Sequence, residues 1–286
     1  MAFELYRASA AAKDVLDEAE RTIPGLLDIM WQGPAEVLQL TVNQQPALVA
    51  AGAAAFAAYL EAGGDEPRFG AGHSLGEITA HVAARSLSLS DALKLVRHRG
   101  TYMQEAVPPG QGAMAAVLKT DRAHVERICL ETEGIVEIAN LNAPEQTVIS
   151  GEAGAVAVAS EQLASEGARV VALDVSAPFH CSLMRPAGER LADRLRGIRF
   201  REPSFDIVTN VTADILGSIE DAADLLEAQV TAPVRWVESI ERLQALGAER
   251  FLEFGSGKVL SGLVKRILNN AEARAITDMK TLQEAL

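Results

Sequence analysis

The order of apolar and polar positions predicts alternating helices and strands in the first hundred residues. Ser9 can cap the first helix, and Pro46 suits the first turn of the second, because proline's fixed φ matches a helix. The expected elements are a helix over 9–24, a helix over 46–63, a strand over 69–72, helical spacing through Val82, and a helix that Ser90 and Asp91 cap.

A second pattern begins at Gly112. Strands are expected over 113–118, 135–141, 146–150 and 169–175, with helices over 122–131 and 153–164. This β-α-β-β-α-β order is the ferredoxin-like arrangement. We therefore predict a small ferredoxin-like subdomain over 112–176, inserted into a large catalytic domain made of residues 1–111 and 177–286.

The last hundred residues return to alternation. The pattern predicts a strand over 205–209, a helix that includes 240–246, a strand over 250–254 and a helix over 259–268. Strands that alternate with helices favour a mostly parallel sheet covered by helices. The predicted fold class is α/β, with a core of the α/β-hydrolase-like type.

Composition and charge exclude several classes of protein. The chain of 286 residues has 39 acidic and 26 basic residues and a net charge of −13, which disfavours nonspecific binding to nucleic acid or to anionic membranes. Cys129 and Cys181 form neither a disulfide framework nor a metal-ligand pattern. The apolar, alanine-rich run from Pro46 to Leu60 is shorter than the roughly 20 residues of a membrane span, and Met1–Glu4 lacks the order of a signal peptide. We expect a cytoplasmic protein.

The strongest local signal is the G-x-S-x-G turn Gly72-His73-Ser74-Leu75-Gly76. It lies between a predicted strand and a predicted helix, where a serine hydroxyl projects above the sheet and the helix offers free N–H groups. Ser74 is therefore the candidate nucleophile, and the backbone N–H of Leu75 the candidate oxyanion donor. A plain glycine-rich turn is the alternative.

A serine nucleophile needs a base, and the chain has five histidines. His180 is the best placed, because it follows a strand in a loop stiffened by proline at the return to the large domain; a structural loop histidine is the alternative. His73 should point away from the nucleophile, and His81 lies inside a helix. His98 stands between arginines, and His124 falls in an exposed helix.

Arg99 follows one helix after the candidate nucleophile. Its planar guanidinium could hold a substrate carboxylate through two parallel hydrogen bonds. From sequence alone, a solvated helix face is the more ordinary interpretation of this position.

A series of short motifs runs through nearly the whole chain in a fixed order. They are Gln45-Pro46-Ala47-Leu48, Gly72-His73-Ser74-Leu75-Gly76-Glu77, Arg99-Gly100, Met103-Gln104-Glu105-Ala106, Gly112-Ala113-Met114, Asn140-Leu141-Asn142-Ala143-Pro144, Pro178-Phe179-His180, Pro233-Val234-Arg235-Trp236 and Gly255-Ser256-Gly257-Lys258-Val259-Leu260. With these motifs the chain resembles the malonyl-CoA:acyl carrier protein transacylases of fatty acid synthesis and the acyltransferase domains of polyketide synthases.

The resemblance implies a role for each matching residue. Ser74 would carry the acyl ester, His180 would be its base, and Arg99 would bind the free carboxylate of the malonyl group. Gln229 matches the position whose backbone carbonyl orients the histidine in place of an acid.

The resemblance also implies the lining of the cleft. His73, Asn142 and the region of Met103 would lie along it, and Phe179 would favour malonyl over methylmalonyl groups. No metal and no cofactor are expected, since malonyl-CoA is the substrate. One departure is that the family opens with a strand and a Phe-Pro-Gly-Gln-Gly loop before the matching region; we expect either a start assigned at an internal methionine, which we favour, or a sheet without its first strand.

The expected reaction is malonyl transfer from malonyl-CoA to acyl carrier protein. A serine hydrolase or thioesterase, and an inactive carrier-binding relative, are the alternatives. The carrier is acidic, so a basic cluster that includes Arg185, Arg190 and Arg194 could dock it; a solvated amphipathic helix is the alternative interpretation. We expect a monomer that binds neither nucleic acid nor membranes.

Overall fold

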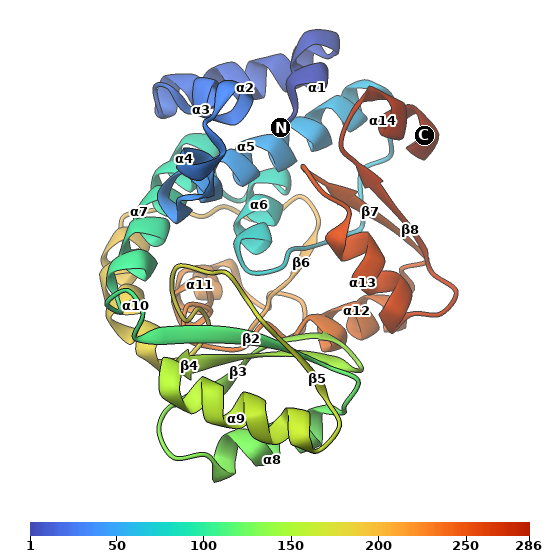
Figure 1. Cartoon of the computed structure of the whole chain (residues 1–286). Coiled ribbons are helices and arrows are strands. Elements are labelled where there is room, and N and C mark those ends of the chain that lie inside the picture. Colours follow the sequence, from blue (N-terminus) through green and yellow to red (C-terminus); the bar gives the residue numbers. More distant parts are fainter.

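The computed structural model describes residues 1–286, and its helices cover most of the chain (Figure 1). The α-helices are α1 (Phe3–Ala8), α2 (Ala10–Thr22), α3 (Leu26–Gln32), α4 (Ala35–Gln39), α5 (Thr41–Glu61), α6 (Leu75–Ala83), α7 (Leu89–Glu105), α8 (Arg122–Glu131), α9 (Ala153–Ser165), α10 (Arg185–Leu195), α11 (Ala222–Ala228), α12 (Trp236–Ala245), α13 (Val259–Ile267) and α14 (Met279–Ala285). Short 3₁₀ turns lie at Ser182–Met184 and Ile219–Asp221. No helix is long and apolar enough to cross a membrane.

The strands form three separate sheets. They are β1 (Phe69–Ala71), β2 (Gly112–Leu118), β3 (Val136–Ala143), β4 (Gln146–Glu152), β5 (Arg169–Ala172), β6 (Asp206–Val208), β7 (Arg250–Phe254) and β8 (Glu272–Ile276). Strands β1 and β6 form one parallel pair, and β7 and β8 form another. The strand pairing in the large domain is thus parallel, as predicted, but it forms two separate pairs rather than one continuous sheet.

The middle of the chain forms the predicted ferredoxin-like unit. Its antiparallel sheet has the strand order β3-β4-β2-β5, with α8 and α9 on one face (Figure 1). Residues alternate across β2: Ala115 and Val117 pack into the core beneath the two helices, whereas Met114 and Ala116 pack into a cluster on the opposite face. The sheet is therefore buried on both faces, which explains the continuous apolar run in β2.

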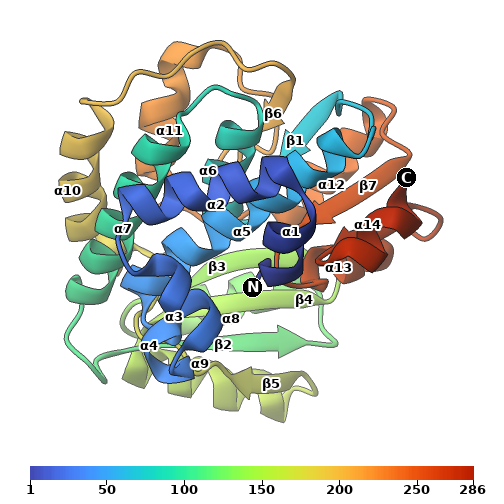
Figure 2. The same cartoon turned by 90° about the horizontal axis from the view of Figure 1, so that it is seen from above.

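The helical part of the molecule is built around α5. This helix is buried along most of its length and packs against α2 and α7 (Figures 1 and 2). Its small side chains permit close approach; a Cβ at Gly52 would lie 2.9 Å from Thr79 Cγ2. The predicted start at Pro46 was wrong, because the helix begins at Thr41 and includes the proline, which gives up one backbone hydrogen bond there.

The cap of α7 also differs from the prediction. Ser88, in extended conformation, accepts the backbone N–H of Asp91 over 3.1 Å, and the helix already includes Ser90. The capping side chain belongs to the residue just before the helix, and Ser90 already lies inside it.

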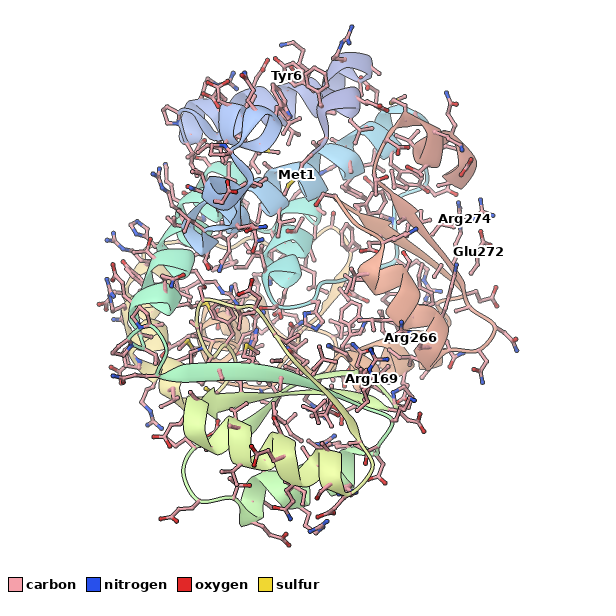
Figure 3. The ribbon with its side chains drawn as sticks, viewed as in Figure 1. Met1, Tyr6, Arg169, Arg266, Glu272 and Arg274 are labelled. Atoms are coloured by element: carbon pink, nitrogen blue, oxygen red, sulfur yellow. The ribbon has the colours of Figure 1, made fainter.

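A hydrogen bond joins the C-terminal part of the chain to the ferredoxin-like sheet. Arg266 of α13 (labelled in Figure 3) donates to the Gln146 side chain of β4 over 2.7 Å.

Candidate active site

Ser74 occupies the tight corner between β1 and α6. Its φ of 52° and ψ of −109° are strained for a residue with a side chain, which is typical of a nucleophile elbow. Gly72 is required by contact, because a Cβ there would lie 1.8 Å from the carbonyl carbon of Gly76. A Cβ at Gly76 would meet nothing within 4 Å, so only the first glycine of the motif makes room for the turn.

The structure brings Ser74 and His180 together across 106 residues of sequence. Ser74 Oγ lies 2.7 Å from His180 Nε2. On the other side of the ring, Nδ1 lies 2.9 Å from the backbone oxygen of Gln229 and 3.2 Å from that of Ala232. Carbonyl oxygens only accept, so Nδ1 carries the proton and Nε2 is free to accept the serine hydroxyl.

The imidazole of His180 is held in its neutral form. Burial lowers its pKa to about 3, and the nearby positive charge of Arg99 acts in the same direction. The side chain is 4% exposed, so a charge on it would lose most of its hydration. At neutral pH the ring is therefore unprotonated at Nε2, the form that a general base requires.

An oxyanion donor lies beside the nucleophile. The backbone N–H of Leu75, the first residue of α6, has no hydrogen-bond partner in the structure, whereas the next N–H, of Gly76, donates to the His73 oxygen over 2.9 Å. The free N–H stands at the positive end of the helix dipole. It can donate to an oxygen that becomes negative next to Ser74.

Arg99 lies inside the protein rather than on a solvated helix face. It is 3% exposed, and its Nη2 donates to Ser74 Oγ and to Gln229 Oε1, each over 3.0 Å. Nη1 donates to Gln45 Oε1 over 3.1 Å, and Nε has no partner. The solvated-face interpretation was wrong, because α7 turns this position towards the interior. Burial lowers the pKa of Arg99 to about 10, opposed by the charge of Glu77, so the guanidinium stays charged at neutral pH.

Asn210 and Glu77, which were not predicted as site residues, stabilise the turn that carries Ser74 through hydrogen bonds. The Asn210 side chain accepts the Ser74 N–H over 2.6 Å and donates to the Gly72 oxygen over 2.7 Å. Asn210 follows β6, the partner of β1, and this pairing was the signal that could have placed it at the same sheet edge. Glu77 is 1% exposed, and burial raises its pKa to about 7.

The four predicted cleft residues take different positions. His73 Nε2 lies 2.8 Å from Asn142 Oδ1, so the His73 side chain is directed to β3 of the small sheet. Phe179 is half-buried and packs against the cluster around Met114. Met103 is only 1% exposed within the main core. It therefore does not line an open cleft, because α7 directs it into the helical core.

The remaining histidines lie apart from Ser74. His81 is fully buried and its Nδ1 lies 3.0 Å from Ser86 Oγ, while burial lowers its pKa to about 4. The His98 ring stacks on Tyr102, and His124 Nε2 lies 2.8 Å from a Glu166 oxygen. No group of three or more His, Cys, Asp or Glu side chains is arranged to hold a metal ion.

The arginines proposed for carrier docking lie on the exposed side of α10. Arg190 pairs with Glu105 over 2.7 Å and lies 3.9 Å above the Tyr102 ring. Arg194 donates to the Tyr102 hydroxyl over 3.1 Å. Two of the three thus contact side chains of α7.

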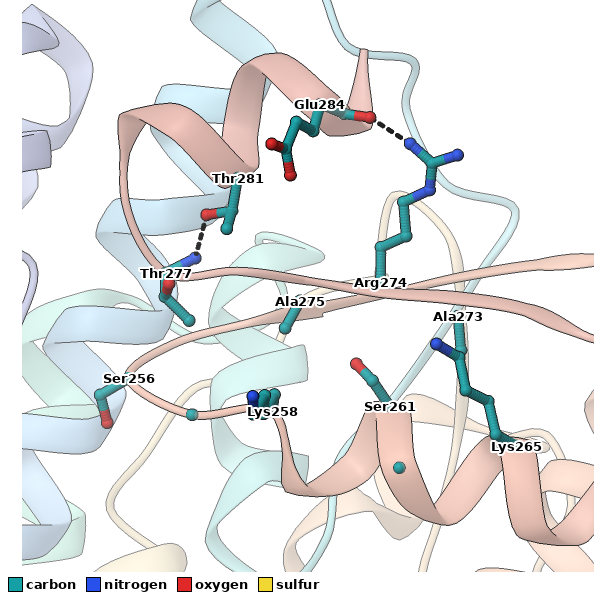
Figure 4. Close-up of a pocket in the computed structure, with 12 residues that line it drawn as sticks. Ser256, Lys258, Ser261, Lys265, Ala273, Arg274, Ala275, Thr277, Thr281 and Glu284 are labelled. Carbon is teal, nitrogen blue, oxygen red and sulfur yellow. Dashed lines mark hydrogen bonds between the residues drawn. The ribbon is translucent and has the colours of Figure 1, made fainter.

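A separate hollow of about 770 Å³ lies beside β8 and α13 (Figure 4). Lys258, Lys265 and Arg274 bring positive charge to it, and Glu284 is its one acidic residue. None of its lining residues belongs to the group around Ser74.

A serine at a strand-to-helix corner, with a neutral histidine against its hydroxyl, defines the class of α/β enzymes that form an ester on serine. The family model described as acyl transferase domain matches residues 1–283 of this sequence. The chain belongs to this acyl transferase family.

Known relatives are similar over nearly their whole length. The malonyl CoA-acyl carrier protein transacylase of Bacillus subtilis is 43% identical over 291 residues, which cover 100% of this chain and 92% of the relative. The solved acyl-carrier-protein S-malonyltransferase of Burkholderia pseudomallei is 40% identical with a TM-score of 0.96, covering 98% of this chain and 93% of that one. A malonyl-transacylase solved in complex with its type II PKS acyl-carrier protein is 41% identical with a TM-score of 0.97, covering 100% and 94%. The family predicted from the motifs and the α/β fold class are confirmed.

Proposed function

We propose that this acyltransferase moves a malonyl group from malonyl-CoA to the pantetheine thiol of acyl carrier protein, in fatty acid biosynthesis. The names of its relatives support this reaction. The observation that carries it is the contact of one hydroxyl with two groups: Ser74 Oγ lies 2.7 Å from the His180 imidazole and 3.0 Å from the Arg99 guanidinium. The first can activate the oxygen, and the second can hold an acyl group that ends in a carboxylate.

The first half of the reaction loads the enzyme. His180 Nε2 takes the Ser74 proton while Oγ attacks the thioester carbon of malonyl-CoA. The oxygen of the tetrahedral intermediate is stabilised by the Leu75 N–H, and a single such donor is worth about 3–4 kcal/mol. The carbon–sulfur bond then breaks, the proton passes from His180 to the CoA sulfur, and a malonyl ester remains on Ser74.

The second half repeats these steps with a different thiol. His180 takes the proton of the carrier's pantetheine thiol, whose sulfur attacks the ester carbon. The bond from carbon to Ser74 Oγ breaks, and Oγ receives the proton from His180. A thioester is activated enough for a serine–histidine pair, so the backbone oxygens of Gln229 and Ala232 suffice to orient the ring.

Arg99 supplies selectivity for the acyl group in this proposal. Its guanidinium is buried, charged and hydrogen-bonded only to neutral oxygens, those of Gln45, Ser74 and Gln229. A malonyl carboxylate would replace neutral acceptors with a negatively charged one, and its two oxygens can accept two parallel N–H groups from the planar guanidinium. Phe179, next to His180, is proposed to restrict substituents on the malonyl group.

The carrier is proposed to dock on the arginines of α10, which begins a few residues after His180. Arg185, Arg190 and Arg194 are exposed there and could meet an acidic carrier surface. We also propose a cytoplasmic location, which the free thiols of Cys129 and Cys181 support, because reducing compartments keep cysteines unpaired.

Incubation of the purified protein with malonyl-CoA and pantetheinylated acyl carrier protein tests the proposal. The expected product is malonyl-carrier, measured by intact mass. Free malonate without malonyl-carrier would identify a thioesterase instead, and a carrier that stays unmodified while malonyl-CoA is unconsumed would contradict enzymatic transfer altogether.

A further inference from the structure

Glu77 is a buried carboxylate that forms no salt bridge. It lies in the first turn of α6 and is 1% exposed. Its Oε2 accepts two hydrogen bonds, from the backbone N–H of Asn210 over 2.9 Å and from Gln229 Nε2 over 2.7 Å. Both donors come from segments more than 130 residues away in sequence, so the carboxylate joins three parts of the chain at one atom.

The two residues that donate to Glu77 also hydrogen-bond the backbone of the nucleophile. Asn210 Oδ1 accepts the Ser74 N–H over 2.6 Å, and Gln229 Nε2 also donates to the Ser74 oxygen over 3.1 Å. Ser74 has a strained backbone, and such a conformation persists only where its surroundings over-determine it. Glu77 thus hydrogen-bonds both of the residues, Asn210 and Gln229, that restrain the backbone of Ser74.

Glu77 also decides which way the Gln229 amide faces. Gln229 Oε1 accepts from Arg99 while Nε2 donates to Glu77. The opposite orientation would set the amide oxygen against a carboxylate and the amide nitrogen against a guanidinium. The carboxylate and the guanidinium together leave one orientation of this side chain.

We propose that Glu77 is a positioning residue for the reaction proposed above, acting through Asn210 and Gln229 on the backbone of Ser74. Like the acid of a catalytic triad, Glu77 is an acidic residue that positions another group, but the group is the nucleophile rather than the histidine. This role requires an acceptor oxygen at Oε2 that can accept both the Asn210 backbone N–H and the Gln229 Nε2–H. The inference rests on the proposed function only for the identity of the acyl group, since the reactivity of Ser74 can be measured with a reagent that carries no malonyl group.

The test uses a fluorophosphonate, which labels an activated serine and needs neither malonyl-CoA nor the carrier. The Glu77→Leu variant removes the acceptor and is expected to slow labelling of Ser74 at least ~100-fold, because a small displacement of the nucleophile is enough for such a loss. The Glu77→Gln variant keeps an acceptor oxygen and is expected to stay within ~10-fold of the native protein. Equal loss in both variants would contradict the role of the acceptor, and a native rate in Glu77→Leu would overturn the inference.

A matched control separates positioning from general stability. Glu253 of β7 accepts the backbone N–H groups of Leu260 and Ser261 and the Ser261 hydroxyl, over 2.7–3.2 Å, with no contact to Ser74. Glu253→Leu should lower the melting temperature without slowing the labelling of the folded protein. Labelling that slowed equally in Glu253→Leu would reduce Glu77 to a merely structural residue and overturn the inference.

The Glu77→Asp variant covers the case in which Glu77→Leu does not fold. Its carboxylate is one methylene shorter and cannot reach both amides, so labelling should slow at least ~10-fold; a native rate would contradict the inference. Malonyl transfer by the native protein is measured alongside. Native protein that is labelled at Ser74 but transfers no malonyl group would overturn the proposed function and leave the labelling comparison valid.

Discussion

Nδ1 of His180 lies 2.9 Å from the backbone carbonyl oxygen of Gln229. A carbonyl fixes the tautomer as an aspartate would, but it adds no negative charge, so the amount by which this contact raises the pKa of the ring is smaller than the amount by which burial and Arg99 lower it. The imidazole, lowered to a pKa of about 3 by burial and by Arg99, is therefore a base that stays neutral well into the acid range.

The first prediction concerns the pH profile of the free protein. An ordinary histidine base with a pKa near 6.5 would lose activity below that pH. Because the pKa of His180 is about 3, the rate of fluorophosphonate labelling of Ser74 should show no loss from protonation of this ring between pH 7 and pH 5. A tenfold fall in the labelling rate for each pH unit below 6.5 would contradict the neutral, buried imidazole.

The same shift makes a prediction for stability. The folded pKa of His180 lies below its unfolded value, so between about pH 6.5 and pH 3 the unfolded chain binds more protons. Its contribution to the free energy of unfolding is present above that window and is lost as the pH falls through it. Urea unfolding of native protein and of His180→Gln should show the steeper acid loss in the native protein; parallel pH dependences would contradict the prediction.

The two glycines of the motif should differ sharply in tolerance. Gly72→Ala places a Cβ 1.8 Å from the Gly76 carbonyl carbon and should destabilise the fold by about 3 kcal/mol or more, because backbone must move. Gly76→Ala, the matched control, meets no neighbouring atom and gains helix propensity of about 0.5–1 kcal/mol. Unfolding free energies measure both, and equal losses at the two positions would refute the geometry of the corner.

Arg99→Leu separates acyl recognition from nucleophile activation. It removes a charged donor that is expected to bind the malonyl carboxylate, a loss of about 3 kcal/mol, so kcat/KM for malonyl-CoA should fall at least ~100-fold. Labelling by a fluorophosphonate, which carries no carboxylate, should fall by less than ~10-fold. A loss of equal size in both assays would mean that the arginine supports Ser74 rather than the substrate.

Charge reversal tests the docking surface on α10. Arg190→Glu together with Arg194→Glu should raise KM for acyl carrier protein about tenfold, while the release of CoA in the first half-reaction stays unchanged. Arg7→Glu together with Arg21→Glu, on the exposed sides of α1 and α2, is the control for net charge, since it also reverses two exposed arginines and lies remote in sequence. A carrier KM equal to that of the control would remove these arginines from the interface.

Much of the fold could be predicted because local patterns decide it. The boundaries of α8 and β7 match the prediction at both ends, since caps and turn residues define them. Strand β8 and helix α14 were missed, although polar and apolar residues alternate over 272–275 of β8. The parallel ladders were expected in one sheet, but strand pairing is set by tertiary contacts that no window of sequence contains.

The residues of the site also fall into those that the local sequence reveals and those that only long-range contacts reveal. Ser74 could be found because its geometry is local to one turn. Asn210, Glu77 and Gln45 could not, since each acts through hydrogen bonds to residues 54 to 152 positions away. The residues alone favoured a solvated helix face for Arg99, and only the family resemblance assigned it to the substrate carboxylate, because the inward direction of this position depends on the packing of α7 against α5.

The most direct measurement is the intact mass of the protein after brief exposure to malonyl-CoA without carrier, followed by peptide mapping. The expected result is a mass gain of one malonyl group, located on Ser74, absent in Ser74→Ala and lost when pantetheinylated carrier is added. An unmodified Ser74 in protein that still transfers malonyl groups, or a malonyl group found on another residue, would contradict it.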